Sequence, residues 1–277
     1  MKYILMMNCP IDGYETFAAW PKKDLQAHIA FQRRFDQSLR ESGELVSAEG
    51  LANPHEAKFV RAGKERTPIT DGVFPEAKEF LAGYWIVDVP TPQRAYEIAA
   101  GASAAPGPGG VPMNMPIEVR QHNGPGAFAR QPVPHKPVPE SKGAQHMKFI
   151  LLTGGTQASW DSFSAWPKND VQAYAAFVDA LNKEIGESGE LVAAEGLAGP
   201  DQAKIVRAGK NGAPITDGIF PEAKEFLAGY WIVDVESPAR AYEIAARASA
   251  APGPGGTPMN NPIEVRQIMS GPPEDLL

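Results

Sequence analysis

The stretch TDGVFPEAKEFLAGYWIVDV, from Thr70 to Val89, occurs again from Thr216 to Val235, with Val73 replaced by Ile219. It joins an Asp-Gly turn signal to a charged segment and then to the apolar run Tyr-Trp-Ile-Val, which is typical of a strand buried on both faces. Because a turn and a set of charged side chains lead directly into a buried strand, the stretch predicts a sheet with a candidate site beside it.

The rest of the chain repeats as well. A shift of 146 residues aligns the two halves without a gap, so that Met1 falls on Met147. From Gly43 to Gln121 about four in five positions are identical in the second copy, and a repeat of this length indicates a duplicated domain and not a solenoid. The expected organisation is a first domain over 1–123, a Pro-rich linker over 124–146, a second domain over 147–268 and a flexible tail over 269–277.

The hydrophobic period in each half predicts the order strand, helix, strand, hairpin, strand, helix, strand. In the first half the strands are expected at Tyr3–Met7, Leu45–Ala48, Gly83–Val89 and Ile117–Gln121, the hairpin at Ala57–Thr70, and the helices from Trp20 to Gly43 and after Thr91. The segment between the first strand and Trp20 is predicted to be a loop. This order is the ferredoxin-like split β-α-β pattern with an inserted hairpin, an α+β fold with both helices on one face of an antiparallel sheet. Since the other face needs a cover, the two units are expected to pack sheet to sheet as an intrachain pseudo-dimer.

The net charge, the cysteine count and the lengths of the apolar runs argue against several classes of function. The net charge of -7 and the pI near 5.3 argue against nucleic acid, which attracts concentrated basic surfaces. The single cysteine, Cys9, excludes an intrachain disulfide, and no Cys or His spacing predicts a metal site. No apolar run approaches the roughly 18 residues of a membrane span. We therefore expect a soluble, cytoplasmic protein without a metal or cofactor, and with no membrane partner.

The repeated charged cluster supplies the first candidate site. Its members are Asp71, Glu76, Lys78 and Glu79, with Asp217, Glu222, Lys224 and Glu225 in the second copy. Carboxylates and an ammonium beside a rigid strand can take acid and base roles when burial and opposite charge separate their pKa values. Asp71 and Asp217 are candidate bases, and the other members are candidate substrate-binding groups. The alternative is that each Asp caps its own turn while the other charges form local ion pairs.

Glu49 and Glu195 form a second candidate pair, each in the sequence Ala-Glu-Gly-Leu at a predicted strand end. A glycine beside the carboxylate permits close approach of another backbone, so each Glu is a candidate general base. The alternative is an ion pair with an arginine: Arg61 or Arg120 for Glu49, and Arg207 or Arg266 for Glu195. His28, which aligns with Tyr174, is a further candidate for proton transfer.

The motifs Val-x-x-Glu-Gly-Leu, Thr-Asp-Gly-x-Phe and Ile-Glu-Val-Arg, in this order in both halves, resemble those of the YCII-related family, specifically its DGPF branch. The resemblance implies a dimeric α+β barrel of ferredoxin-like units, here made by two halves of one chain. Two departures matter. The proline of Asp-Gly-Pro-Phe is displaced to Pro75 and Pro221, and the histidine that many members carry on the first helix falls near Gln32 and Val178.

Together these features predict a protein that binds a small polar or anionic ligand. If it is an enzyme, the expected chemistry is cofactor-independent proton transfer, of the isomerase or lyase type, with Asp71 or Glu49 as base and Lys78 as electrostatic stabiliser. The missing helix histidine favours the alternative, a non-catalytic ligand-sensing or interaction module. The intrachain pair leaves room for further homo-oligomers.

Overall fold

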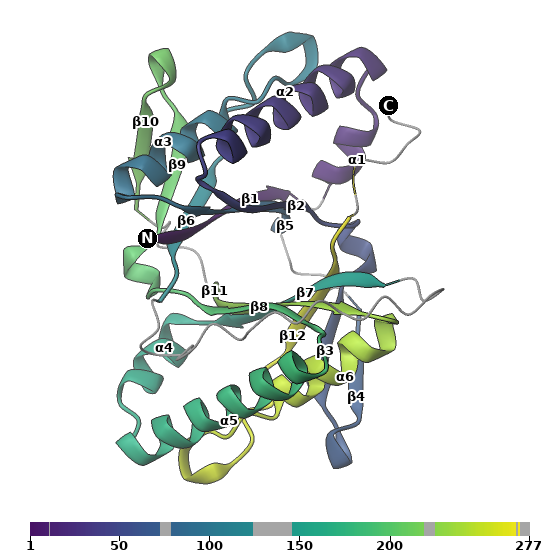
Figure 1. Ribbon diagram of the computed structural model, residues 1–277, viewed down its shortest axis with the longest axis vertical. Coiled ribbons are helices and arrows are strands. Elements are labelled where there is room, and N and C mark those ends of the chain that lie inside the picture. Colours follow the sequence, from purple (N-terminus) through teal and green to yellow (C-terminus); the bar gives the residue numbers. More distant parts are fainter. Residues whose placement is uncertain (11, 73–78, 124–145, 219–224, 270, 272–277) are drawn as a thin grey trace.

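Two β-sheets lie face to face in the structure, and helices cover their outer sides (Figure 1). The structure is a computed structural model that describes residues 1–10, 12–72, 79–123, 146–218, 225–269 and 271.

Each half has the predicted order of strands, helices and hairpin. The first half contains β1 (Lys2–Pro10), α1 (Gly13–Ala18), α2 (Lys22–Glu41), β2 (Leu45–Gly50), β3 (Lys58–Ala62), β4 (Pro68–Asp71), β5 (Glu79–Asp88), α3 (Pro92–Ser103) and β6 (Ile117–Gln121). The second half contains β7 (Met147–Gly155), α4 (Gln157–Ser164), α5 (Lys168–Glu187), β8 (Leu191–Gly196), β9 (Lys204–Ala208), β10 (Pro214–Asp217), β11 (Phe226–Val235), α6 (Pro238–Ser249) and β12 (Ile263–Gln267). The α+β fold of two tandem ferredoxin-like units is confirmed.

Local sequence signals set the ends of the long helices. Helix α2 ends just before Gly43, whose φ of 75° lies in the left-handed region that glycine adopts without steric cost. Helix α3 begins after Thr91, whose hydroxyl oxygen accepts a hydrogen bond from the backbone N–H of Arg94 at 3.3 Å. Pro92 occupies the first helical position, where its missing N–H is not needed.

The predicted loop after the first strand is wrong in both halves, because the short helices α1 and α4 lie there. Helix α4 starts with a capping box. The backbone N–H of Ser159 donates to the hydroxyl of Thr156 at 3.1 Å, and the N–H of Thr156 donates to the hydroxyl of Ser159 at 2.8 Å. Helices of six and eight residues are too short for hydrophobic periodicity to reveal them.

The halves exchange their hairpins. The strand orders of the two sheets are β10-β9-β6-β1-β5-β2 and β4-β3-β12-β7-β11-β8. The β3–β4 hairpin of the first half pairs with β12 of the second, with Val60 opposite Ile263, and β9 pairs with β6, with Val206 opposite Ile117. Figure 1 shows β3 and β4 in the layer of α5 and α6, and β9 and β10 in the layer of α2 and α3. Each sheet is therefore completed by strands from the other half.

The inner faces of the two sheets bury one shared hydrophobic cluster. Its members are Ile4, Met6, Leu51, Leu81, Tyr84, Ile86, Ile150, Leu152, Leu197, Tyr230, Ile232 and Ile268. The neighbours of its two tyrosines, Trp85 and Trp231, pack instead on the helix side, because successive residues of a strand point to opposite faces. The predicted sheet-to-sheet packing is thereby confirmed, although only the tyrosines of the Tyr-Trp pairs take part in it.

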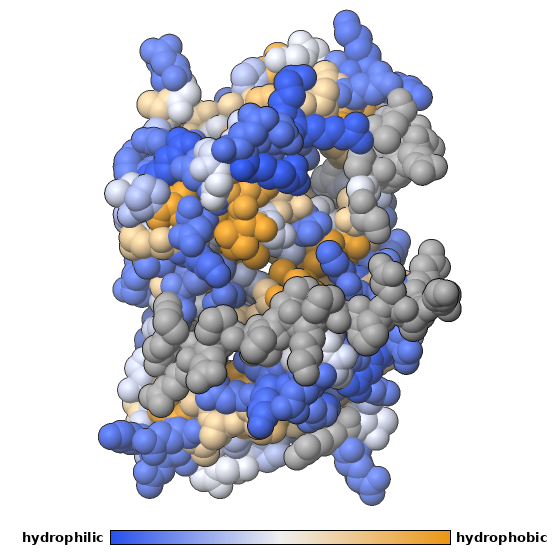
Figure 2. All heavy atoms as spheres, in the orientation of Figure 1, coloured by the Kyte–Doolittle hydropathy of each residue, from blue (hydrophilic) through white to orange (hydrophobic). Residues whose placement is uncertain are grey.

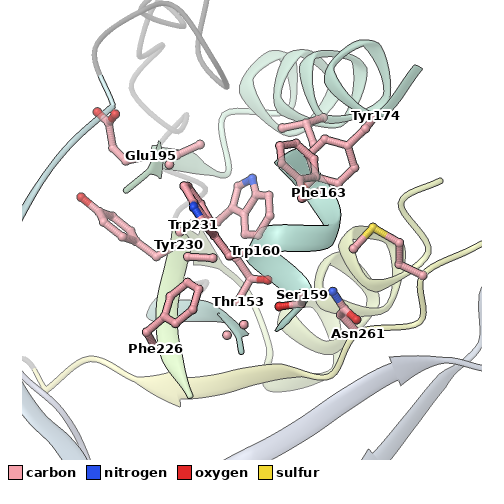
Figure 3. Close-up of a pocket in the computed structure, with 18 of the residues that line it drawn as sticks. Thr153, Ser159, Trp160, Phe163, Tyr174, Glu195, Phe226, Tyr230, Trp231 and Asn261 are labelled. Atoms are coloured by element: carbon pink, nitrogen blue, oxygen red, sulfur yellow. The ribbon is translucent and has the colours of Figure 1, made fainter. Parts of the chain in front are cut away.

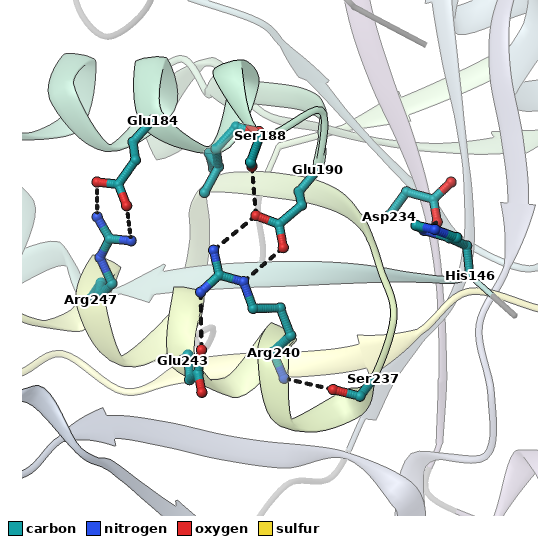
Figure 4. Close-up of polar contacts among 10 residues, drawn as sticks. His146, Glu184, Ser188, Glu190, Asp234, Ser237, Arg240, Glu243 and Arg247 are labelled. Carbon is teal, nitrogen blue, oxygen red and sulfur yellow. Dashed lines mark hydrogen bonds and ion pairs between the residues drawn. The ribbon is translucent and has the colours of Figure 1, made fainter. Parts of the chain in front are cut away.

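Ion pairs hold the outer helices together. Arg240 of α6 donates to both carboxylate oxygens of Glu190, in the turn after α5, at 2.7 and 2.8 Å, and Arg247 pairs with Glu184 (Figure 4). Arg94 and Glu44 form the corresponding pair in the first half at 2.7 Å. Figure 2 shows hydrophilic residues over much of the two ends of the molecule, while hydrophobic residues reach this face in the band between the layers. None of the helices in the described ranges has the length and apolar character needed to cross a membrane.

Candidate functional site

A cavity of about 210 Å³ lies in the second half, between α4 and α5 on one side and strands β7, β8 and β11 on the other (Figure 3). Its wall is formed by Thr153, Gly154, Gly155, Ser159, Trp160, Ser162, Phe163, Trp166, Tyr174, Val178, Asn182, Ala194, Glu195, Gly196, Phe226, Ala228, Gly229, Tyr230, Trp231, Met259 and Asn261. Aromatic rings provide much of this wall, and the remaining polar groups are mainly hydroxyls and amides.

The aromatic rings of the wall support one another edge to face. The ring centroids of Phe163 and Tyr174 lie 5.7 Å apart at 73°, and those of Trp160 and Phe226 lie 6.1 Å apart at 76°. Such T-shaped contacts place the positive edge of one ring against the negative face of another and hold both in place. The indole N–H of Trp231 donates to the amide oxygen of Asn182 at 2.8 Å, which fixes a further side of the cavity. These contacts fix the orientations of the aromatic side chains in the wall.

Among the described residues, Glu195 is the predicted site residue that belongs to the cavity wall. It lies on β8 opposite Tyr230 of β11, and the two side chains share the inner side of the strands, away from Phe163 and Tyr174 (Figure 3). The Glu195 side chain keeps 23% of its surface exposed. Burial of the rest raises the pKa of its carboxyl group, while Lys2 of the first half acts in the opposite direction.

A histidine from the other half stands beside Glu195. His122, which directly follows β6, has its Nδ1 atom 4.0 Å from a carboxylate oxygen of Glu195. Its Nε2 atom lies 3.2 Å from the hydroxyl of Tyr230. Burial lowers the pKa of His122 to about 4, so the ring is neutral around pH 7. The carboxylate, imidazole and phenol thus form a polar cluster where the two halves meet.

The equivalent carboxylate of the first half, Glu49, has other neighbours. The hydroxyl of Ser47 donates to it at 3.4 Å, and Ile268 occupies the place that corresponds to His122. Burial raises the pKa of Glu49, and Lys148 opposes the shift. The two carboxylates therefore share a burial pattern but differ in their polar partners.

The arginines considered as partners for Glu49 and Glu195 are engaged elsewhere. Arg120 pairs with Glu118 at 3.3 Å and Arg266 with Glu264 at 3.2 Å, in each case along the same strand. Arg61 and Arg207 lie on the exchanged hairpins, and the alternative of an ion pair with these four arginines is wrong, since each of them has another carboxylate.

Asp71 and Asp217 are the last residues of β4 and β10, the edge strands of the exchanged hairpins. Asp71 pairs with Arg61 at 2.6 Å, and Asp217 pairs with Arg207 at 3.6 Å. Both carboxylates are substantially exposed, with 43% and 57% of the side-chain surface accessible. Strand β4 stands at the opposite edge of its sheet from β8, so Asp71 is remote from Glu195. These ion pairs were not predicted, since the alternative for each Asp was a cap of its own turn.

Of the other six members of the charged cluster, two lie within the described ranges. Glu79 is exposed at the start of β5, and Glu225 is exposed just before β11. Glu76, Lys78, Glu222 and Lys224 lie outside the described residues. Because Asp71 belongs to one sheet and Glu79 to the other, the first and last carboxylates of the first cluster do not share a strand edge. The catalytic and substrate-binding roles suggested for all ten residues stay predictions.

The family model for the YCII-related domain matches residues 1–111 and 147–255. The chain belongs to the YCII-related family. The two matches confirm the resemblance seen in the motifs and the tandem duplication. No curated protein matches the sequence.

Solved structures similar to this YCII-related protein include two mutants of chlorite dismutase from Candidatus Nitrospira defluvii. One has 7% identity and a TM-score of 0.47, the other 6% and 0.46, with coverage of 99% and 97% of this chain and 92% and 90% of those chains. A heme-binding protein from Thermus thermophilus has 9% identity and a TM-score of 0.42, with coverage of 97% of this chain and 91% of that chain. Identities this low say nothing about a shared ligand.

The positions of the family histidine on the first helix have different roles in the two halves of this YCII-related protein. Val178 belongs to the cavity wall. Gln32 donates its side-chain amide to Nε2 of His28 at 2.9 Å, while Nδ1 of His28 lies 2.9 Å from the carbonyl oxygen of Pro106 and donates to it. His28 is buried, which lowers its pKa, and both ring nitrogens are satisfied. These contacts describe a structural histidine.

Neither His122 nor the aromatic residues of α4 were among the residues predicted from the sequence to form the site. A signal for both existed in the repeat, since His122 aligns with Ile268 and Trp160 aligns with Tyr14. Differences between nearly identical copies mark positions that the common fold does not require. Within the described part of the chain, no group of three or more His, Cys, Asp or Glu side chains is arranged to hold a metal ion.

Proposed function

We propose that this YCII-related protein binds a small molecule with one flat ring and a neutral polar substituent in the cavity of the second half. The observation that carries the proposal is the wall itself, in which preorganised aromatic rings face hydroxyl and amide groups. A cavity of about 150 Å³ accommodates benzene, so the space of about 210 Å³ suits a single substituted ring. Apolar walls with a few polar groups are the usual composition of a ligand pocket.

Charge favours a neutral ligand over an anionic one. The described residues that line the cavity include one acidic residue, Glu195, and neither Lys nor Arg. An anion would need a cation to offset the loss of its hydration, and the candidate, Lys224, lies outside the described residues. The proposal therefore narrows the polar or anionic ligand predicted from the sequence to a polar, uncharged one.

A second candidate function is cofactor-independent proton transfer, of the isomerase or lyase type. The favouring observation is Glu195, a residue of the cavity wall whose carboxyl pKa is raised by burial, so that its carboxylate accepts a proton more readily than an exposed one. The non-catalytic alternative is ligand sensing, for which binding alone is sufficient.

Saturation-transfer NMR on the full chain tests the binding proposal. The probes are benzamide, phenol and benzyl alcohol, with cyclohexanol as the non-aromatic control. We expect signal transfer to at least one aromatic probe, lost in Phe163→Ala and retained in the matched variant Phe17→Ala. The two phenylalanines align in the repeat, and each packs on a tryptophan at 4.9 Å. Failure of all three probes to bind, or equal loss in both variants, contradicts the proposal.

A further inference from the structure

Glu195 and Glu49 occupy equivalent positions in the repeat and on their strands and are similarly buried, yet within the described ranges only Glu195 faces a histidine. Each carboxylate lies opposite a buried tyrosine, Tyr230 or Tyr84, on the inner face of its sheet. Beside Glu195, His122 forms an isolated β-bridge with Leu197 of the second half. Ile268 forms the equivalent β-bridge with Leu51 of the first half. The fold accepts isoleucine at this place, so its architecture does not require the imidazole.

One ring nitrogen of His122 has no hydrogen-bond partner among the described residues and lies near Glu195. The ring is 5% exposed, its Nε2 contacts the hydroxyl of Tyr230 at 3.2 Å, and its buried Nδ1 has no hydrogen-bond partner among the described residues. The nearest carboxylate oxygen, on Glu195, stands 4.0 Å from Nδ1. A negative charge on that side favours the tautomer that carries its proton on Nδ1, and Nε2 then accepts from Tyr230. A small rotation of the Glu195 side chain would complete an N–H to carboxylate hydrogen bond.

The lysine and tyrosine neighbours of the two carboxylates correspond between the halves. Lys2 on β1 faces Glu195, and its repeat equivalent Lys148 on β7 faces Glu49. Tyr230 faces Glu195 as Tyr84 faces Glu49, and the two tyrosines interact where the halves meet. Glu49 has two added neighbours, the hydroxyl of Ser47 and, farther off, charges on α2. The histidine is the titratable neighbour that Glu195 has and Glu49 lacks among the described residues.

We propose that His122 is a positioning residue for Glu195, so that the second half carries the one carboxylate of the pair that a histidine from the opposite half orients. In this arrangement Glu195, oriented by a histidine from the first half, is the acid–base group of the chain. Its repeat equivalent, Glu49, has no histidine to orient it in the described part of the chain. The inference rests on the proposed function in taking Glu195 as the carboxylate that a ligand in the cavity meets. Its test, however, needs no ligand.

The experiment measures the proton affinities of both carboxylates by carboxyl-carbon NMR in the intact chain, with Glu195→Gln and Glu49→Gln for assignment. In His122→Ile, which installs the residue found at the equivalent position of the repeat, Glu195 loses the N–H dipole that stabilises its charged form. We expect it to bind its proton about threefold to tenfold more tightly, while Glu49 stays unchanged as the internal control. His122→Asn, which keeps an N–H near the place of Nδ1, should restore part of the difference, whereas His122→Gln, which keeps one near Nε2, should restore less.

The reverse exchange supplies an independent measurement. Ile268→His places an imidazole beside Glu49 and should lower the proton affinity of Glu49 without changing that of Glu195. An unchanged Glu195 in His122→Ile, or equal shifts of both carboxylates, would overturn the inference even if the aromatic probes bind. Conversely, the expected shifts with no probe binding would sustain the role of His122 and refute only the proposed ligand.

Discussion

The guanidinium of Arg120 lies over the ring of Phe226, 5.7 Å from its centroid, and joins the first half of the chain to the wall of the cavity in the second. Arg120 has no exposed surface, and one of its Nη atoms donates to the carbonyl of Ala198, also in the second half. Arg266 makes the reciprocal contacts, over the ring of Phe80 and to the carbonyl of Ala52 at 2.6 Å. Each of the two buried arginines therefore links the two halves of the chain.

Replacement of Arg120 by Met should destabilise the protein strongly. The change retains most of the apolar stem but leaves the carbonyl of Ala198 and the carboxylate of Glu118 without their partner. Breaking a buried charged interaction of this kind costs about 2 to 4 kcal/mol. The loss is measured as the free energy of unfolding in urea. Arg61→Met, which breaks the exposed pair with Asp71, should change it by less than about 1 kcal/mol, and equal losses in the two variants would contradict this link between the halves.

Cleavage of the chain between its halves should leave one particle. Because the β3–β4 hairpin pairs with β12 and β9 pairs with β6, each sheet contains backbone hydrogen bonds between the two halves. A protease site inserted between residues 124 and 145 allows the cut to be made after folding. We expect both fragments to elute together in size-exclusion chromatography under native conditions and to separate in urea. Separation without denaturant would argue against hairpin exchange.

The fold was largely predictable because its signals are local and occur twice. Each signal determines structure only within a few residues: the Tyr-Trp-Ile-Val runs predict strands, Thr91 caps a helix and Gly43 ends one. Because the same signals recur in the second copy, each assignment is less ambiguous. Hairpin exchange was not predictable from the sequence. Strand β3 could pair with β6 of its own half or with β12 of the other half, and both strands have the sequence Ile-Glu-Val-Arg. The choice between identical edges depends on the connections, which carry no hydrophobic pattern.

The candidate site was predictable only in part. Glu195 was identified from its glycine neighbour and lies on the cavity wall, but the turn-forming Asp71 and Asp217 were carried to the outer sheet edges by the exchanged hairpins. His122 comes from the other half, and its nearness to Glu195 depends on how two sheets pack. The distance between His122 and Glu195 cannot be predicted from their separation in the sequence.

Gly229→Ala should disturb Glu195 directly. A Cβ atom at Gly229 would stand 2.8 Å from the carbonyl oxygen of Glu195, which real Cβ contacts avoid, so β8 must move. We expect a loss of about 1 to 3 kcal/mol in the free energy of unfolding, together with weaker binding of the aromatic probes. Gly83→Ala creates the same clash, at 2.9 Å, with the carbonyl of Glu49. It should cost similar stability but leave probe binding intact, and a binding loss shared by both variants would contradict a site confined to the second half.

Acid should release the pair between Glu44 and Arg94. Hydrogen bonds from Arg94 lower the pKa of Glu44 from 4.5 to about 2, against a smaller opposing effect of burial. A folded-state pKa below the unfolded value stabilises the fold fully above pH 4.5, and that stabilisation disappears as the pH falls toward 2. Urea denaturation of the native protein and of Glu44→Gln between pH 7 and pH 2 measures it. The difference in free energy of unfolding between the two should be constant above about pH 5 and shrink steadily below pH 4.5. A difference that persists undiminished at pH 2 would show that Glu44 acts through packing and not through its charge.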